Sequence, residues 1–302
     1  MTIRDIIITY TEELKQMSDT PRLDVEIILQ KVLGDVDRIY IHLNLNKEME
    51  KNQMNEFNNL IQQRLEGRPV AYIVGNREFM GLDFYVKEGV LIPRPDTETL
   101  VEELISICKD KKVEILDIGT GSGAITVSLA KYIENAKVMS FDISDIPLEV
   151  GPINAKSNGV GDKIEFRKSD LFSAIEGTNK VFDVIVSNPP YIPRIDMPTL
   201  HTQVKDYEPY NALEGGVDGL DFYRNITKES VKYLSENGIL AYEVGHDQAD
   251  DVELIMKNNG YTNIYRKKDI QGIDRVVIGY KLWYNERIEN KYKQNIKEVN
   301  IC

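Results

Sequence analysis

The sequence predicts an α/β protein in which a small helical bundle precedes a larger domain built on a mostly parallel sheet. Apolar residues recur at helical spacing in the first part of the chain, and β-rich apolar runs alternate with helical segments after it. A short stretch of alternating residues lies between the two parts. Seven β-rich runs are present, so we expect a seven-stranded, doubly wound sheet with helices on both faces.

Residues 1–76 are expected to form the helical domain. Apolar residues recur every three or four positions in the segment 3–17 and again in the segment 54–65. Between them, Thr20–Pro21 is typical of a helix start, because a proline in the first turn has no amide hydrogen to leave unpaired. Gly34 then predicts the end of that second helix.

Residues 77–93 are expected to form a β-hairpin that links the two domains. Side-chain character alternates over the segment 78–86 around Gly81, which favours a tight turn between two short strands. The segment 93–95, Pro-Arg-Pro, follows as a rigid connection, and a helix is predicted from Asp96 to about Cys108.

Residues 94–282 are expected to form the second domain, which carries the sheet. The predicted strands are 113–118, 137–141, 163–166, 182–186, 238–244, 263–266 and 275–281. The tail, residues 283–302, is polar with little apolar periodicity, and we expect it to be a frayed helix or disordered.

Composition limits the partners of the chain. Its formal net charge is −12, which disfavours a nucleic-acid footprint because such a surface needs a basic face. The cysteines, Cys108 and Cys302, and three histidines have no metal-ligand spacing, so neither a metal site nor a structural disulfide is expected. No apolar run approaches the ~18 residues of a membrane span. We therefore expect a soluble, cytoplasmic protein.

A glycine-rich turn follows the first predicted strand and opens a helix. Its residues are Gly119, Thr120, Gly121, Ser122 and Gly123, with Asp117 just before them. Such a turn allows a ligand to approach the main chain, as in Rossmann-like domains. Asp142, at the end of the second strand, is placed to accept hydrogen bonds from ribose hydroxyls. By itself this pattern fits both NAD and S-adenosyl-L-methionine.

The sequence Asn188-Pro189-Pro190-Tyr191 follows the fourth predicted strand. This motif distinguishes between the two cofactors. The carbonyl oxygens of the Asn188 side chain and the Pro189 backbone can each accept one proton of a planar NH2 group. The prolines limit the ordering required on binding, and Tyr191 offers a flat face for stacking. A dehydrogenase would need an acid/base group, and no histidine lies at a strand end in this half. We therefore interpret the domain as a class I methyltransferase that uses S-adenosyl-L-methionine.

Two further positions complete the predicted site. After the third strand, Asp170 is placed to accept from the adenine amine while Leu171 covers the ring. Arg94 is expected either to approach the substrate or to form a surface ion pair. We assign Asn188, Pro189 and Tyr191 to catalysis, and Asn188 also to the cofactor site.

With these residues in place, the chain resembles bacterial release factor glutamine methyltransferases, the HemK/PrmC family, from about residue 20 to 280. The resemblance rests on Arg22–Asp24, Pro69–Gly75, Glu78–Phe79, Leu91–Glu98, Gly119–Gly123, Asn188–Tyr191, Glu208–Pro209, Ala212–Leu213, Gly215–Gly216, Tyr242–Gly245 and Asp274–Val276. It implies methylation of the glutamine side chain in the GGQ motif of class 1 peptide chain release factors. It also implies that the helical domain helps to hold this protein substrate.

The chain departs from the family pattern after Asp142. Pro147, Gly151 and Pro152 stand where relatives have an uninterrupted helix, and Pro152 is expected to kink it. Leu171 stands where some relatives have tryptophan. Three alternatives stay open: a ribosomal-protein glutamine methyltransferase, an adenine-amine methyltransferase on nucleic acid, and a non-catalytic scaffold.

Overall fold

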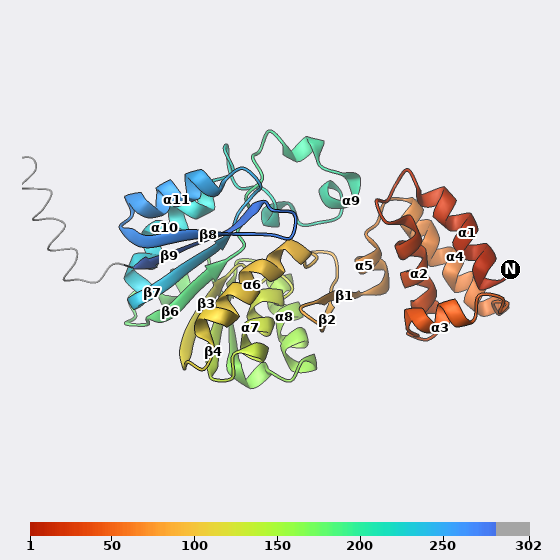
Figure 1. Cartoon of the computed structure of the whole chain (residues 1–302), viewed down its shortest axis with the longest axis horizontal. Coiled ribbons are helices and arrows are strands. Elements are labelled where there is room, and N and C mark those ends of the chain that lie inside the picture. The colour runs from red at the N-terminus through yellow and green to blue at the C-terminus, as the bar shows by residue number, and fades with distance from the viewer. Residues whose placement is uncertain (282–302) are drawn as a thin grey trace, which may run out of the picture. The chain divides into compact units, whose positions relative to one another are not determined.

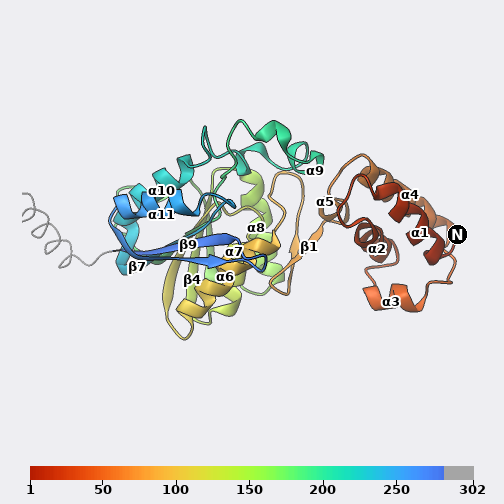
Figure 2. The same ribbon diagram turned by 45° about the horizontal axis from the view of Figure 1, so that its top comes forward.

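A computed structural model describes residues 1–281, which form two compact units. The helical unit comprises Met1–Arg77, Val86–Glu88 and Thr199–Glu208, and the sheet unit comprises Glu78–Tyr85, Gly89–Pro198 and the described residues from Pro209 onward. Figures 1 and 2 show the elements of each unit. The prediction for the tail, residues 283–302, lies outside the described residues.

The helical unit is built from short amphipathic helices. They are α1 (Ile3–Leu14), α2 (Pro21–Val32), α3 (Arg38–Leu43), α4 (Lys51–Leu65), α5 (Val70–Val74) and α9 (Thr202–Lys205). Pro21 occupies the first turn of α2, as predicted, and Gly34 follows the helix with φ of +92°. Ile6, Ile28 and Phe57 from α1, α2 and α4 are fully buried, so the predicted apolar faces form one core.

A buried ion pair lies within the helical unit. Arg64 is 2% exposed, and its Nε donates to Oδ2 of Asp24 at 2.7 Å. Its guanidinium also donates to the Gln203 side chain at 3.4 Å, and the Tyr207 hydroxyl donates to the Glu66 carbonyl at 3.2 Å. These contacts explain why residues 199–208, which follow far along the sequence, group with the helices.

The hairpin consists of β1 (Asn76–Phe79) and β2 (Leu82–Tyr85), around the predicted turn. Both turn residues, Met80 and Gly81, have positive φ, +54° and +70°. This pair of angles is the two-residue hairpin turn whose twist matches that of the strands. Tyr85 exchanges two hydrogen bonds with the Asn154 side chain, at 2.7 and 2.9 Å, which fixes the second strand of the hairpin within the sheet unit.

The sheet unit contains a seven-stranded sheet in the order β5-β4-β3-β6-β7-β9-β8, in which β9 is antiparallel to both neighbours. The strands are β3 (Val113–Ile118), β4 (Ala136–Asp142), β5 (Ile164–Lys168), β6 (Phe182–Ser187), β7 (Leu234–Glu243), β8 (Tyr261–Lys268) and β9 (Asp274–Lys281). Each overlaps a predicted strand, so the predicted fold class is confirmed.

Helices cover both faces of this sheet, as Figure 1 shows. The helices α6 (Pro95–Cys108), α7 (Ala124–Tyr132) and α8 (Asp145–Ser157) share one core, and α10 (Asp221–Tyr233) and α11 (Ala249–Asn258) share the other. Successive strand residues point to opposite faces, so Ile115 packs in the first core and Leu116 in the second.

The helix α8 continues through Pro152 to Ser157, with Pro147 in its first turn. Gly151 lets it pack closely, because a Cβ there would lie 2.7 Å from the Phe166 ring and 3.1 Å from the Thr120 methyl group. A Cβ on Gly123 would lie 3.3 Å from the Gly151 Cα. The unusual composition of α8 therefore brings its backbone against the glycine-rich turn.

Candidate active site

A cavity of about 340 Å³ lies in the sheet unit where β3, β4 and β6 end. The carboxyl ends of parallel strands meet at this edge, which is where such sheets bind ligands. Among the residues predicted for the site, the lining includes Arg94, Gly119, Thr120, Gly121, Ser122, Asp142, Asp170, Leu171, Asn188, Pro189 and Pro190. The fold therefore brings segments separated by almost a hundred residues to one cavity.

The glycine-rich turn closes over the end of β4. The backbone N–H groups of Gly119 and Thr120 both donate to the Phe141 carbonyl, at 2.8 and 2.9 Å. Gly119, Gly121 and Gly123 have φ of +94°, +54° and +82°, which residues with a side chain rarely adopt. The absence of a side chain leaves the main chain of this turn open toward the cavity.

Asp117 lies beneath the turn and does not line the cavity. It is fully buried, and its Oδ2 accepts hydrogen bonds from the hydroxyls of Thr126 and Ser140, the latter at 3.2 Å. Ser140 in turn contacts the Thr120 hydroxyl at 2.8 Å. Burial raises the pKa of Asp117 to about 7 against the opposing hydrogen bonds from Thr126 and Ser140. Asp117 therefore acts on the cavity only through the turn that it supports.

Asp142 ends β4 and lines the cavity, as predicted. Its Oδ2 accepts from the Gly121 backbone N–H at 3.1 Å, and its Oδ1 accepts from the Ser144 N–H at 2.9 Å. Burial raises its pKa, and backbone hydrogen bonds from Ser144 and Gly121 oppose this effect. Each carboxylate oxygen retains a lone pair, so both can accept a further hydrogen bond from a ligand.

The loop after β5 presents Leu171 to the cavity in an unusual backbone conformation. Leu171 has φ of +47°, a left-handed value that costs roughly 1–2 kcal/mol for a residue with a side chain. The Ser169 hydroxyl stabilises this bend by donating to the Leu171 carbonyl at 2.8 Å. Asp170, next to it, is exposed and also lines the cavity.

Asn188 follows β6 and lies opposite the glycine-rich turn. A Cβ added to Gly119 would lie 3.9 Å from the Asn188 carbonyl, so the two loops are close neighbours. The Asn188 side chain donates through Nδ2 to the Thr97 hydroxyl at 3.3 Å. The following prolines pack tightly, because a Cβ on Gly215 would lie 2.6 Å from the Pro190 carbonyl.

Tyr191 and Gly123 are predicted site residues that do not line the cavity. Tyr191 packs against the core shared by α10 and α11, and its carbonyl accepts from the Gln248 side chain at 2.9 Å. Burial raises its pKa to about 12, with the Glu243 carboxyl as the next cause. Stacking of Tyr191 on a substrate therefore stays a prediction.

Sequence reasoning did not select two polar residues near Asn188. Thr97 lines the cavity from the first turn of α6, and Glu243 lies behind it, buried at the end of β7. A signal for Glu243 exists, since a carboxylate that directly follows the apolar run 239–242 at the end of β7 is unusual. Thr97 carries no such signal.

Among residues 1–281, no helix is both long and apolar enough to span a bilayer. Two family models match the chain, a PrmC N-terminal domain over residues 5–75 and a methyltransferase domain over residues 109–298.

Individual relatives match over almost the whole chain. The release factor glutamine methyltransferase of Clostridium acetobutylicum is 43% identical, covering 93% of this chain and 99% of that protein. That of Clostridium botulinum is 38% identical, covering 92% and 98%. The crystal structure of a methyltransferase from Pyrococcus furiosus has a TM-score of 0.52 at 21% identity, over 74% of this chain and 98% of that one, and shares the fold.

Proposed function

The chain belongs to the release factor glutamine methyltransferase family, and we propose that it methylates the glutamine of the GGQ motif in class 1 peptide chain release factors. It is a protein-(glutamine-N5) methyltransferase that depends on S-adenosyl-L-methionine. The residues at the cavity, rather than the family name, suggest how the reaction proceeds.

The cavity fits this cofactor. Its volume of about 340 Å³ lies within the range of small-molecule sites. The open backbone of Gly119–Gly123 suits the methionyl part, the Asp142 oxygens suit the ribose hydroxyls, and Leu171 suits a face of the adenine. We assign cofactor binding to these residues and to Asp170.

When bound, S-adenosyl-L-methionine supplies a methyl group on a sulfonium and leaves as S-adenosyl-L-homocysteine. The glutamine amide nitrogen is a poor nucleophile because its lone pair is conjugated. We assign Asn188 Oδ1 and the Pro189 carbonyl to accept its two protons and so to hold the nitrogen in line with the methyl carbon. The nitrogen forms the new bond to carbon, and its extra proton passes to water.

A single observation carries this proposal: the Asn188 loop and the glycine-rich turn line one cavity. A Cβ added to Gly119 would lie 3.9 Å from the Asn188 carbonyl oxygen. A methyl acceptor held by the first loop would then face a cofactor held by the second. Orientation of this kind accounts for much of the acceleration that a site without an acid/base group can provide.

We assign the helical unit to the recognition of the release factor. A GGQ loop is small, so most binding energy must come from surfaces remote from the reacting amide. The helix α3 offers such a surface, because Ile39 and Leu43 are four residues apart and 67% and 80% exposed. The match of residues 5–75 to an N-terminal domain model of this family supports the assignment.

The proposal is tested by incubating the full chain with isotope-labelled S-adenosyl-L-methionine and an intact class 1 release factor, followed by tandem mass spectrometry. One label is expected on the GGQ glutamine, and none on a matched release factor that carries alanine there. Ribosomal protein and DNA serve as competing acceptors. Label on either of these, with an unmodified release factor, would overturn the proposal.

A further inference from the structure

Glu243 is a buried carboxylate directly behind the Asn188 loop. It is the last residue of β7, which runs parallel to β6. Ser187, the last residue of β6, lies opposite Tyr242, so the residues that follow them, Asn188 and Glu243, are neighbours at the strand ends. Glu243 is 1% exposed and is not part of the cavity lining, whereas Asn188 and Thr97 are. Glu243 therefore does not contact a ligand in the cavity directly, and it acts on one through Asn188 and Thr97.

The three side chains form one hydrogen-bonded group. Asn188 donates through Nδ2 to the Thr97 hydroxyl at 3.3 Å, and hydrogen bonding from Thr97 and from Asn188 acts to lower the pKa of the Glu243 carboxyl. The Glu243 backbone is held as well, because its carbonyl accepts from the Tyr223 hydroxyl at 2.9 Å. Within the described chain, Glu243 Oε2 has no hydrogen-bond partner, so the carboxyl has unused accepting capacity.

An asparagine side chain can point either its oxygen or its NH2 group into a cavity, and its neighbours decide which. A threonine hydroxyl both donates and accepts, so Thr97 alone cannot decide. An ionised carboxylate only accepts, so it attracts the NH2 end of Asn188 and leaves the oxygen facing the cavity. The opposite orientation would present NH2 to the substrate NH2, and two donors cannot bond.

We propose that Glu243 is a positioning residue, which fixes the orientation of Asn188 so that its carbonyl oxygen receives the substrate amide. The proposal rests on the proposed function, because it explains how Asn188 is prepared for the methyl acceptor. Carboxylates at metal sites act similarly: they hydrogen-bond to a ligand of the metal and fix its orientation, and their removal lowers activity although they do not contact the substrate.

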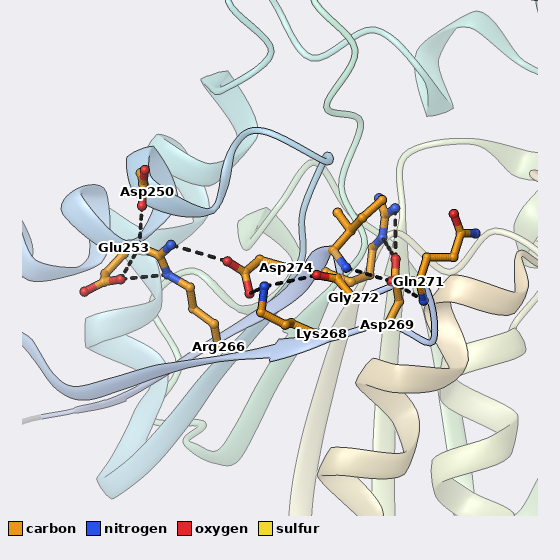
Figure 3. A network of polar contacts seen from close by, with 10 residues as sticks. Asp250, Glu253, Arg266, Lys268, Asp269, Gln271, Gly272 and Asp274 are labelled. Carbon is orange, nitrogen blue, oxygen red and sulfur yellow. Dashed lines mark hydrogen bonds and ion pairs between the residues drawn. The ribbon is translucent and has the colours of Figure 1, made fainter.

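The groups around Glu243 leave its charge incompletely compensated. The charge of Arg275 on β9 acts on Glu243, but its guanidinium lies 3.3 Å from both Asp96 and Asp269. Asp269 in the β8–β9 turn also accepts from the N–H group of Gln271, as Figure 3 shows, and from that of Ile273. Tyr191 and Tyr223 face Glu243 from the site loop and from α10.

Burial raises the pKa of Glu243 to about 7, against hydrogen bonding from Thr97 and the charge of Arg275. A protonated Glu243 can donate as well as accept, so it no longer selects one orientation of Asn188. The transfer rate should therefore fall as pH decreases through this pKa.

The test compares full-length Glu243→Gln and Glu243→Asp with Glu236→Gln, a matched change at an exposed position of β7. The glutamine variant should lower the single-turnover methylation rate by about 10- to 100-fold, by analogy with orienting groups at metal sites. It should leave the affinity for S-adenosyl-L-methionine unchanged and lose the decrease at low pH. The aspartate variant should recover part of the rate, and Glu236→Gln should behave as wild type.

A second measurement needs neither turnover nor a substitution of Glu243. The Asn188 side-chain NH2 signal in the NMR spectrum of the wild-type protein, assigned by its loss in Asn188→Ala, should shift as Glu243 titrates. A signal independent of pH, or a wild-type rate in Glu243→Gln, overturns the positioning role. A wild-type enzyme that does not methylate release factors overturns the proposed function alone, because the NMR signal still reports on Glu243.

Discussion

Two buried carboxylates of the helical unit and two of the sheet unit have their charge compensated in different ways. In the helical unit, Asp24 and Glu26 are 4% and 0% exposed, and each contacts an arginine. In the sheet unit, Asp117 and Glu243 are 0% and 1% exposed and lie among hydroxyl and amide groups. All four side chains are shielded from solvent, but Asp117 and Glu243 lie deeper in the protein than Glu26, and the compensation of their charge also differs.

This difference changes how the groups titrate. Burial alone would raise the pKa of Glu26, but hydrogen bonds from Arg22 and Arg38 outweigh it and lower the pKa. Burial raises the pKa of Asp117 and of Glu243 to about 7, because their hydrogen bonds do not outweigh it. The arginine-paired carboxylates Asp24 and Glu26 thus connect helices, whereas Asp117 and Glu243, whose pKa values are raised by burial, support the loops of the cavity, as is typical of functional sites.

The largest expected effect breaks the pairing in the helical unit. Arg64→Met removes the cation from a buried pair, which should destabilise the fold by about 3–5 kcal/mol. Arg22→Met, at an exposed arginine whose partner keeps Arg38, should cost less than about 1 kcal/mol. Chemical denaturation measures both changes. Equal losses for the two variants would show that burial of the pair is unimportant.

The next effect concerns the acceptor loop of the sheet unit. Asn188→Ala should reduce single-turnover methylation of a release factor on the order of 10²–10³-fold, as for loss of one preorganised hydrogen-bonding group. Cofactor binding and thermal stability should stay near wild type. Asn188→Asp keeps an oxygen that can accept from the substrate amide but adds a negative charge. The activity that remains in this variant therefore measures how much of the rate comes from orientation of the amide alone. A normal rate for Asn188→Ala would place the methyl acceptor elsewhere.

A smaller effect is expected at the cofactor. Asp142→Asn keeps the shape of the side chain but removes its charge, which should weaken S-adenosyl-L-methionine binding by about 1.5–3 kcal/mol, the worth of a hydrogen bond to a charged group. Isothermal titration calorimetry gives the affinity. The matched control is Asp145→Asn, an exposed aspartate of α8 that pairs with Lys168. Unchanged affinity in Asp142→Asn would remove this residue from the site.

Measured per pH unit, the smallest effect is a change in the pH dependence of stability. Between the ordinary aspartate pKa of 3.8 and the folded value of about 7, the folded protein keeps a proton on Asp117 that the unfolded chain has released. Asp117 therefore lowers stability as pH rises through this window. Asp117→Asn should flatten that decrease by at most about 1.4 kcal/mol per pH unit. Urea unfolding at several pH values measures the slope, and an identical slope in the variant contradicts the shifted pKa.

Local patterns were sufficient to locate the strands and both loops of the cavity. The run before Asn188 is apolar and β-rich, and the structure ends β6 at Ser187. Thr20–Pro21 likewise marked the start of α2, and Gly81 marked the hairpin turn. Such patterns work because side-chain alternation, helix capping and glycine conformations are properties of neighbouring residues.

Long-range pairing was decided by the tertiary structure. Nothing local brings Thr97, Asn188 and Glu243 together, because α6 packs on a sheet in which β6 and β7 are neighbours only by the strand order. The same holds for residues 199–208, which group with helices far earlier in the sequence, and for Tyr191, which packs against the core shared by α10 and α11 instead of lining the cavity. A sequence pattern reports which face of a segment is buried, but the partner across that face is selected by packing of the whole chain.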